Sequence, residues 1–324
     1  MSIHQCNIVI RFILLFVFAF YCQGYGQNKK KLIEESLKIL QKYDPQGYAI
    51  VESVPRKPVK YNLCGSTITF SSSGSVEEYL SENSLEKMVE ELPTLVHEFN
   101  HTYTSNAYPH LIKNNICDDN DYNVYWLETN NTILVKLDKT FPSKRIYEYI
   151  RKNKLNTFRT ETYINGTSST QNEGVFGLLD EYNSYRLGAM CYLNLFQYYQ
   201  DTKGDPKDWL MFYLGHTQSS MLSYFEFKFF ILQYLIYAQE NEKKSYESIM
   251  ANQAFCQAFV WIDTSFQQII ETYIALYKKI ISEEKESFSS ALTLEQAEDY
   301  KTLTKELQKP QYHSMMELLR SKAR

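Results

Sequence analysis

Residues 92–101 read Leu-Pro-Thr-Leu-Val-His-Glu-Phe-Asn-His, and this stretch decides the fold around the most informative residues of the chain. Its apolar residues recur at helical spacing, which predicts a helix over 84–101. His97 and His101 are four positions apart, so a helix places both on one face, a single turn from each other. We expect Pro93 near the first turn of a new helix or at a kink, because proline is poorly tolerated deep inside a helix.

A histidine pair at this spacing, with Glu98 beside it, is the His-Glu-x-x-His pattern of zinc hydrolases. Zn²⁺ held by two imidazoles and one further protein ligand keeps its fourth position for water and lowers the pKa of that water toward ~7. A neighbouring carboxylate must then take the proton, and Glu98 is placed to act as this general base. The alternative is a pair of surface histidines without a metal.

A second predicted helix, over 172–185, supplies candidates for the third ligand. Glu181 lies among aromatic and apolar residues, where an unpaired carboxylate is costly unless a cation compensates it. Glu173 lies near the start of the helix, where the helix dipole alone explains an acidic residue. We favour Glu181 and keep Glu173 as the alternative. Asp180 has three possible roles: it orients a metal ligand, it binds the metal itself, or it is an ordinary solvated charge on the helix.

The two segments together resemble the zinc helices of gluzincin metallopeptidases. The resemblance implies a zincin fold in which His97, His101 and a downstream Glu hold zinc, Glu98 acts as base, and peptide bonds are hydrolysed without a covalent intermediate. The Asn172-Glu173 pair is similar to that of thermolysin-like enzymes, although Gly177 stands where those have an acidic residue. The metzincin pattern does not fit, because Thr104 and Ala107 occupy the places of its Gly and third His.

Hydrolysis through an oxyanion also requires a hydrogen-bond donor opposite the metal. The candidates are Tyr185, one helical turn beyond Glu181, and His216, which we expect in a loop leading into a helix; an ordinary structural role is the alternative for both. In zincins an edge strand binds the extended substrate. Residues 122–137 or 159–164 could supply such a strand here.

The predicted fold class is α+β, with short strands in an N-terminal lobe of about 27–170 and helices in a C-terminal lobe of about 171–324. We predict a first helix over 29–43, strands at 48–54, 66–70 and 159–164, and a hairpin over 122–137. Capping boxes at Thr264 with Gln267 and Thr293 with Gln296 predict two helix starts. The apolar stretch 221–238 is interrupted by Glu226 and Lys228, which favours a buried core helix over a membrane span.

Hydrophobic residues make up 44% of the chain and charged residues 22%, the composition of an ordinary globular protein. The net charge is -4 and no long basic run occurs, so nucleic acid is not an expected partner. The 27 Tyr and 19 Phe are interpreted as core residues. Composition therefore leaves the histidine pattern as the main indication of function.

Residues 1–26 are predicted to be a signal peptide cleaved before Gln27, which implies a secreted, periplasmic or cell-envelope protein without stable membrane insertion. A retained anchor and lipidation of Cys22 are the alternatives. Four cysteines follow, and either disulfides or free buried thiols are compatible with them: Cys64, Cys117, Cys191 and Cys256. The glycosylation sequons at Asn100, Asn130 and Asn165 are interpreted as incidental, because one lies inside the histidine pattern.

The main functional hypothesis is a secreted zinc metallopeptidase acting on peptide or protein substrates. The same ligands and base would also serve a zinc hydrolase of non-peptide amides or esters. A third hypothesis is a catalytically silent binding module on a zincin scaffold. The presence of Glu98 argues against this module, because a structural zinc needs no general base and usually has four protein ligands.

Overall fold

The computed structural model describes residues 28–63, 66–71, 74–112, 121–166, 169–206, 209–283 and 293–324. In this part of the chain helices dominate and two small antiparallel sheets occur, which confirms the coarse α+β class. The predicted signal peptide with Cys22 lies outside the described residues, as do Cys64 and Cys117. Cys191 and Cys256 are buried free thiols.

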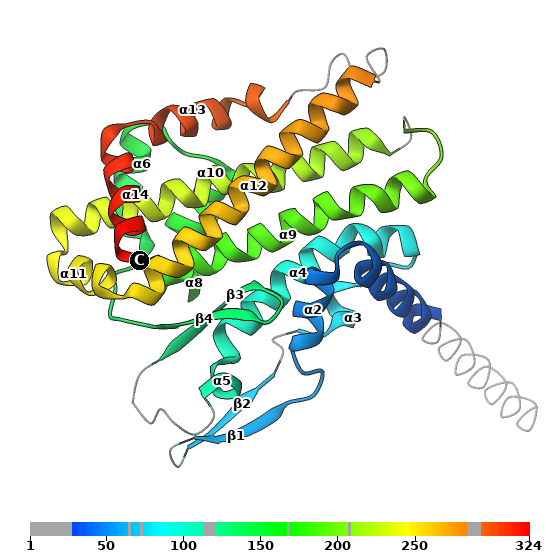
Figure 1. Cartoon of the computed structure of the whole chain (residues 1–324), viewed down its shortest axis with the longest axis horizontal. Coiled ribbons are helices and arrows are strands. Elements are labelled where there is room, and N and C mark those ends of the chain that lie inside the picture. The colour runs from blue at the N-terminus through cyan, green and yellow to red at the C-terminus, as the bar shows by residue number, and fades with distance from the viewer. Residues whose placement is uncertain are drawn as a thin grey trace, which may run out of the picture.

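Three long helices lie side by side and form the body of the molecule, and a fourth packs on the outer side of the first (Figure 1). They are α9 (Val175–Thr202), α10 (Leu210–Asn241), α12 (Gln253–Glu283) and α4 (Leu85–Asn106). The segment 221–238 lies in α10 with most of its side chains buried, which confirms a core helix. None of the helices in the described ranges combines the length and apolar character needed to cross a membrane.

Shorter helices surround this body. In chain order they are 28–43, α2 (Pro45–Ser53), α3 (Val76–Tyr79), α5 (Tyr108–Ile112), η1 (Ser143–Ile146), α6 (Tyr147–Lys152), α7 (Phe158–Thr160), η2 (Glu161–Asn165), α8 (Ser169–Asn172), α11 (Lys243–Ala251), η4 (Leu294–Gln296), α13 (Glu298–Leu307) and α14 (Pro310–Lys322). The first of them confirms the helix predicted over 29–43. The C-terminal pair α13 and α14 lies on the side of the three-helix body opposite the sheets (Figure 1).

The two sheets are hairpins. β1 (Val59–Leu63) pairs with β2 (Ser66–Phe70), and β3 (Tyr122–Glu128) pairs with β4 (Asn131–Lys136). The hairpin over 122–137 and the strand at 66–70 are therefore confirmed. The middle of β3 is buried and packs against α4, so this hairpin covers one side of the helix that carries the histidine pair.

The predicted strand at 48–54 is wrong, because these residues belong to α2. Pro45 occupies the first turn, where its fixed φ favours a helix and its missing N–H costs nothing. Ile50 and Val51 are buried, and α2 packs against α4. Packing of this apolar face outweighs the β-branched character of the stretch.

The predicted strand at 159–164 is also wrong, because the chain forms α7 and the π-helical turn η2 there. Thr157 and Thr160 make a reciprocal capping box that starts the helical segment. Arg159 is buried and its Nη1 donates to Glu226 Oε2 at 2.6 Å, a contact with α10 that no local pattern indicates.

Two helices are longer than predicted. α4 begins after its N-cap Ser84 and contains Pro93 in its interior, so Pro93 does not start a helix. α12 begins at Gln253, and Thr264 lies inside it with its hydroxyl donating to the Val260 carbonyl at 2.8 Å, so the predicted cap at Thr264 is wrong. The capping box of Thr293 with Gln296 is confirmed.

Candidate metal centre

The helices α4 and α9 cross closely at Gly188. A Cβ atom added there would lie 3.1 Å from the Pro93 carbonyl oxygen and 3.6 Å from the Cβ of His97. Beside this crossing Asn100 donates to the Ser184 hydroxyl at 2.7 Å. Because Gly188 has no side chain, the face of α4 that carries the histidines lies directly against α9. The hydrogen bond of the buried Asn100 stabilises this contact.

Arg186 fixes α9 to the end of β3. The guanidinium is buried, and its Nη2 donates to the carbonyls of Trp126 at 3.0 Å and Leu127 at 2.9 Å. The Tyr125 hydroxyl donates to the Phe176 carbonyl at 3.0 Å and joins the same strand to the first turn of α9. Because β3 also packs against α4, these bonds hold the three elements of the site in one arrangement.

Three potential ligand atoms converge at the crossing. The Nε2 atoms of His97 and His101 are 3.0 Å apart. Glu181 Oε2 lies 3.3 Å from His101 Nε2 and 3.7 Å from His97 Nε2. All three atoms lie within 4.8 Å of one another, so His97, His101 and Glu181 form a group that could hold a metal ion.

Residues of α9 hold both imidazole rings in place. His101 Nδ1 lies 2.6 Å from Asp180 Oδ2, and His97 is hydrogen bonded to the backbone of Ser184. Histidines that bind metals nearly always donate their second N–H to a carboxylate or a backbone carbonyl, which fixes the tautomer and the ring orientation. Asp180 thus occupies the supporting position that the sequence offered as one of its possible roles.

The charges of the group favour a cation. Burial raises the pKa of Glu181. Burial lowers the pKa of His97 well below its usual value, and the nearby His101 and Arg159 add to this effect. Among the described residues, Glu181 Oε2 and Asp180 Oδ1 are buried side-chain atoms without a hydrogen-bond partner. Asp180 and Glu181 outweigh the effect of burial on His101 and raise its pKa well above the usual value. A positive charge among the two Nε2 atoms and Glu181 Oε2 therefore stabilises the buried carboxylate of Glu181.

Glu173, the alternative third ligand, does not belong to this group. It precedes α9, and the following Gly174 has φ +58°, a conformation that ends the preceding turn and starts α9 in a new direction. A Cβ at Gly174 would lie 2.5 Å from the Phe141 carbonyl oxygen. Burial raises the pKa of Glu173, and its side chain is hydrogen bonded to Asn123.

Comparison with protein-family models, curated proteins and solved structures finds no match for the chain.

A cavity of about 260 Å³ adjoins the group at His97, whereas His101 and Glu181 are not part of its lining. It brings together His97, Glu98 and both predicted donors, Tyr185 and His216. The full lining is Pro93, Thr94, His97, Glu98, Arg159, Tyr163, Tyr185, Gly188, Tyr192, His216, Ser219 and Ser220. His216 lies in the second turn of α10, so the loop predicted for it is wrong. We call this cavity the metal pocket, after the candidate group that it adjoins; it is lined by one carboxylate, three phenols and one guanidinium.

Two of these side chains escaped sequence reasoning. The hydroxyls of Tyr163 and Tyr185 are 2.9 Å apart, and the Arg159 guanidinium carbon lies 4.6 Å from the centre of the Tyr185 ring. The Tyr185 ring in turn meets the His97 ring edge to face at 4.6 Å. Arg159 and Tyr163 both lie in the segment expected to form a strand. Glu226 on α10 is buried, and a buried carboxylate requires a partner of opposite charge. The occurrence of Arg159 together with Glu226 in the sequence is therefore the signal that could have indicated this segment.

Proposed function

We propose that the chain is a zinc-dependent hydrolase of peptide bonds, with His97, His101 and Glu181 as ligands and Glu98 as general base. The observation that carries the proposal is the convergence of three ligand atoms within 4.8 Å beside a pocket that Glu98 lines. Two imidazoles and one carboxylate are a donor set that suits zinc. Three protein ligands also leave a coordination position open, as in catalytic rather than structural zinc sites.

The residues fit zinc on a second ground. Glu181 Oε2 is buried and lies 3.3 Å from His101 Nε2 and 3.7 Å from His97 Nε2, its nearest charged neighbours at this crossing. A cation shared by these three atoms satisfies all of them at once. Asp180 and the Ser184 backbone hold the rings in the orientation that such sharing requires.

The proposed mechanism assigns one task to each side chain of the pocket. Zinc, when bound, acts as a Lewis acid and lowers the pKa of a coordinated water toward about 7. Glu98 accepts the proton of the attacking water and returns it to the nitrogen of the leaving amine. Tyr185 donates a hydrogen bond to the oxygen that becomes negative, and Tyr163 holds the Tyr185 hydroxyl. The positive charge of Arg159 beside the Tyr185 ring favours the developing anion.

The substrate class follows from the gluzincin resemblance and the pocket. The resemblance implies a zincin fold, in which the extended substrate pairs with an edge strand. Residues 159–164 are helical, so the β3–β4 hairpin is the remaining candidate for that edge strand. The proposed signal peptide places such an enzyme outside the cytoplasm, where it would act on peptides or proteins.

Elemental analysis of the purified mature protein tests the proposal first. We expect about one zinc per chain, lost in His97→Ala and in Glu181→Ala, and kept in the matched control Glu173→Ala. Cleavage of a peptide library by the native protein but not by Glu98→Gln would then establish the activity. Protein that takes up no metal even after zinc is supplied would refute the proposal. Zinc binding with turnover of esters alone would replace the peptide substrate.

A further inference from the structure

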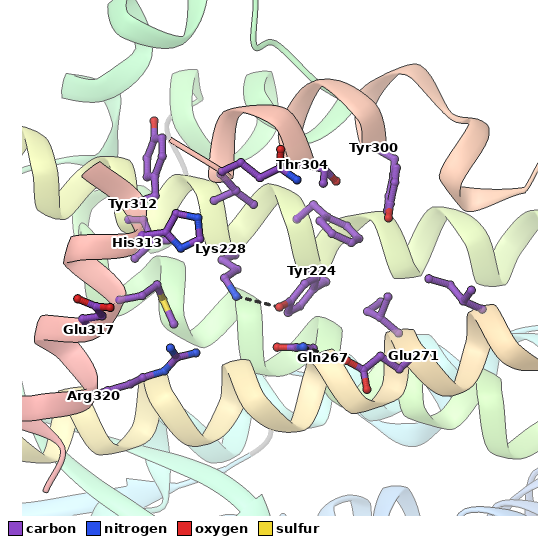
Figure 2. Close-up of a pocket in the computed structure, with 17 residues that line it drawn as sticks. Tyr224, Lys228, Gln267, Glu271, Tyr300, Thr304, Tyr312, His313, Glu317 and Arg320 are labelled. Atoms are coloured by element: carbon purple, nitrogen blue, oxygen red, sulfur yellow. Dashed lines mark hydrogen bonds between the residues drawn. The ribbon is translucent and has the colours of Figure 1, made fainter. Parts of the chain in front are cut away.

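A second cavity lies between α10, α12, α13 and α14 (Figure 2). Its volume is about 480 Å³, which is within the range typical of small-molecule sites. Of the residues in the described ranges, none lines both this cavity and the metal pocket. It therefore requires an explanation separate from the proposed hydrolysis, and we name it the C-terminal cavity.

One end of the C-terminal cavity is rich in nitrogen-bearing side chains. Lys228 reaches it from α10, and Figure 2 shows His313 and Arg320 extending from α14 toward the side on which Lys228 lies. Glu271 and Glu317 also line the cavity but are solvent exposed, and Glu271 accepts a hydrogen bond from Gln267 at 2.9 Å. These two carboxylates therefore share the rim of the cavity with His313 and Arg320, which are exposed as well.

Lys228 is held in place at this end. Its ammonium lies 2.8 Å from Asp263 Oδ1 and donates to the Tyr224 hydroxyl at 2.9 Å. Asp263 also accepts a hydrogen bond from the Tyr182 hydroxyl at 2.9 Å, so its charge is divided between two donors. Arg320 is exposed and forms no ion pair with any residue that the structure describes. A ligand entering here meets one fixed cation and one free cation.

The other end of the cavity is apolar. Phe225 and Tyr300 pack edge to face with ring centres 4.8 Å apart and form a wall. Ile270 and Ile274 of α12 continue this wall, whereas Leu232, Leu307 and Met316 line the cavity toward α14. Thr304 lies on the lining, but its hydroxyl is itself buried and faces away from the open space. The cavity thus has an ionic end and an apolar end.

We propose that the C-terminal cavity binds an amphipathic organic acid, with its carboxylate at Arg320 and Lys228 and its apolar chain along Phe225 and Ile274. A carboxylate forms its strongest hydrogen bonds with guanidinium and ammonium groups. An apolar chain gains free energy on leaving water for the aliphatic and aromatic wall. Both interactions are needed, so neither a short acid nor a long amine binds well.

Calorimetric titration with octanoate tests this site. The titration uses the full-length His97→Ala variant in its metal-free form, because the carboxylate of octanoate could otherwise bind zinc at the proposed metal site. We expect octanoate to bind, and butyrate and octylammonium to bind at least tenfold more weakly. Arg320→Glu should weaken octanoate binding at least tenfold, since a charged hydrogen bond becomes a repulsion. The matched control Lys322→Glu makes the same charge change on the exposed end of α14, outside the cavity, and should leave binding unchanged.

Three results would overturn the proposed acid site: no octanoate binding to the metal-free protein, equal affinity for octylammonium, or equal weakening by Arg320→Glu and Lys322→Glu. None of these results bears on the zinc proposal, because that proposal is tested by the metal content of variants at His97 and Glu181, outside the C-terminal cavity. Conversely, a chain that binds no zinc would still show octanoate binding in this titration.

Discussion

Glu226 and Lys228 are two positions apart on α10, yet they serve different cavities. Glu226 is completely buried and pairs with Arg159 beside the metal pocket. Lys228 keeps 14% of its side chain exposed and pairs with Asp263 at the wall of the C-terminal cavity. One helix thus places an enclosed ion pair next to the histidines and a partly open one next to α14.

The polar side chains around the two cavities also differ in how enclosed they are. At the metal pocket the polar groups are bonded to one another, as in the pairs His101 with Asp180 and Tyr163 with Tyr185. At the C-terminal cavity the ionic rim consists of exposed residues such as His313 and Arg320. Bonded and buried groups are preorganised for charge development, whereas exposed long side chains adapt to a ligand. The first arrangement suits catalysis and the second suits binding.

The largest effect should come from Glu98→Gln. If catalysis belongs to the metal pocket, this change lowers peptide hydrolysis about a thousandfold, because a positioned general base contributes on the order of 10²–10⁴. Metal content and melting temperature should stay at their native values. The control Glu86→Gln changes an exposed carboxylate on the same helix and should keep full activity. A Glu98→Gln variant with more than a tenth of native activity would contradict its role as base.

The enclosed ion pair should be the more costly one to break. Arg159→Met leaves Glu226 buried without its partner and should lower the free energy of unfolding by about 3–5 kcal/mol. Lys228→Met should cost less, because Asp263 keeps its hydrogen bond from the Tyr182 hydroxyl and the replaced side chain lines a cavity that water can enter. Urea denaturation of both variants measures the difference. Equal losses, or a larger loss for Lys228→Met, would remove the distinction between the two pairs.

Tyr185→Phe tests the donor of the metal pocket. Loss of one hydrogen bond to the developing oxyanion should reduce kcat about a hundredfold with little change in KM. Tyr163→Phe should cause a smaller loss, since Tyr163 acts through the Tyr185 hydroxyl at 2.9 Å. Steady-state kinetics on one peptide substrate separate these effects. If Tyr163→Phe is the more damaging change, the two roles must be exchanged.

Asp180→Asn should weaken zinc binding by about 10–100-fold, because the supporting carboxylate orients His101 and increases its basicity. Competition with a zinc chelator gives the affinity. Asp205→Asn serves as the control, since that carboxylate is exposed and distant from the group in the sequence. An unchanged affinity would reduce Asp180 to a structural residue.

The smallest expected effect concerns α12, which borders the C-terminal cavity. As an N-cap, Thr264 would contribute about 0.5–2 kcal/mol, but inside a helix its replacement by Ala should change stability by at most about 0.5 kcal/mol. Thermal unfolding decides between the two positions. A destabilisation near 1 kcal/mol would indicate that the helix starts at Thr264 after all.

Much of the candidate site could be predicted because its signals are local. The spacing of His97 and His101 fixes their common face once the helix forms, and Glu181 was distinguished from Glu173 by its apolar neighbours alone. The hairpin over 122–137 was predictable from the turn residues between its two apolar runs, although β3 is buried at consecutive positions rather than on one face alone.

The remaining parts depend on contacts between distant segments. Arg159 and Tyr163 enter the metal pocket because their segment is helical and pairs with α10, which alternation within the segment could not reveal. The strand predicted at 48–54 failed because its apolar face packs on α4. The loop predicted for His216 is wrong because α10 continues through the preceding Gly215, a residue type that more often ends a helix.

The bonds from Arg186 and Tyr125 to the backbone have a consequence for local opening. They join α9 to β3, while β3 and α9 both pack on α4, so none of the three can separate without breaking buried hydrogen bonds in the others. Backbone amides of these elements should therefore exchange with solvent as one cooperative unit. On the proposed function, a nascent chain would gain hydrolytic activity only after α9 has docked, which protects its own unfolded segments from cleavage.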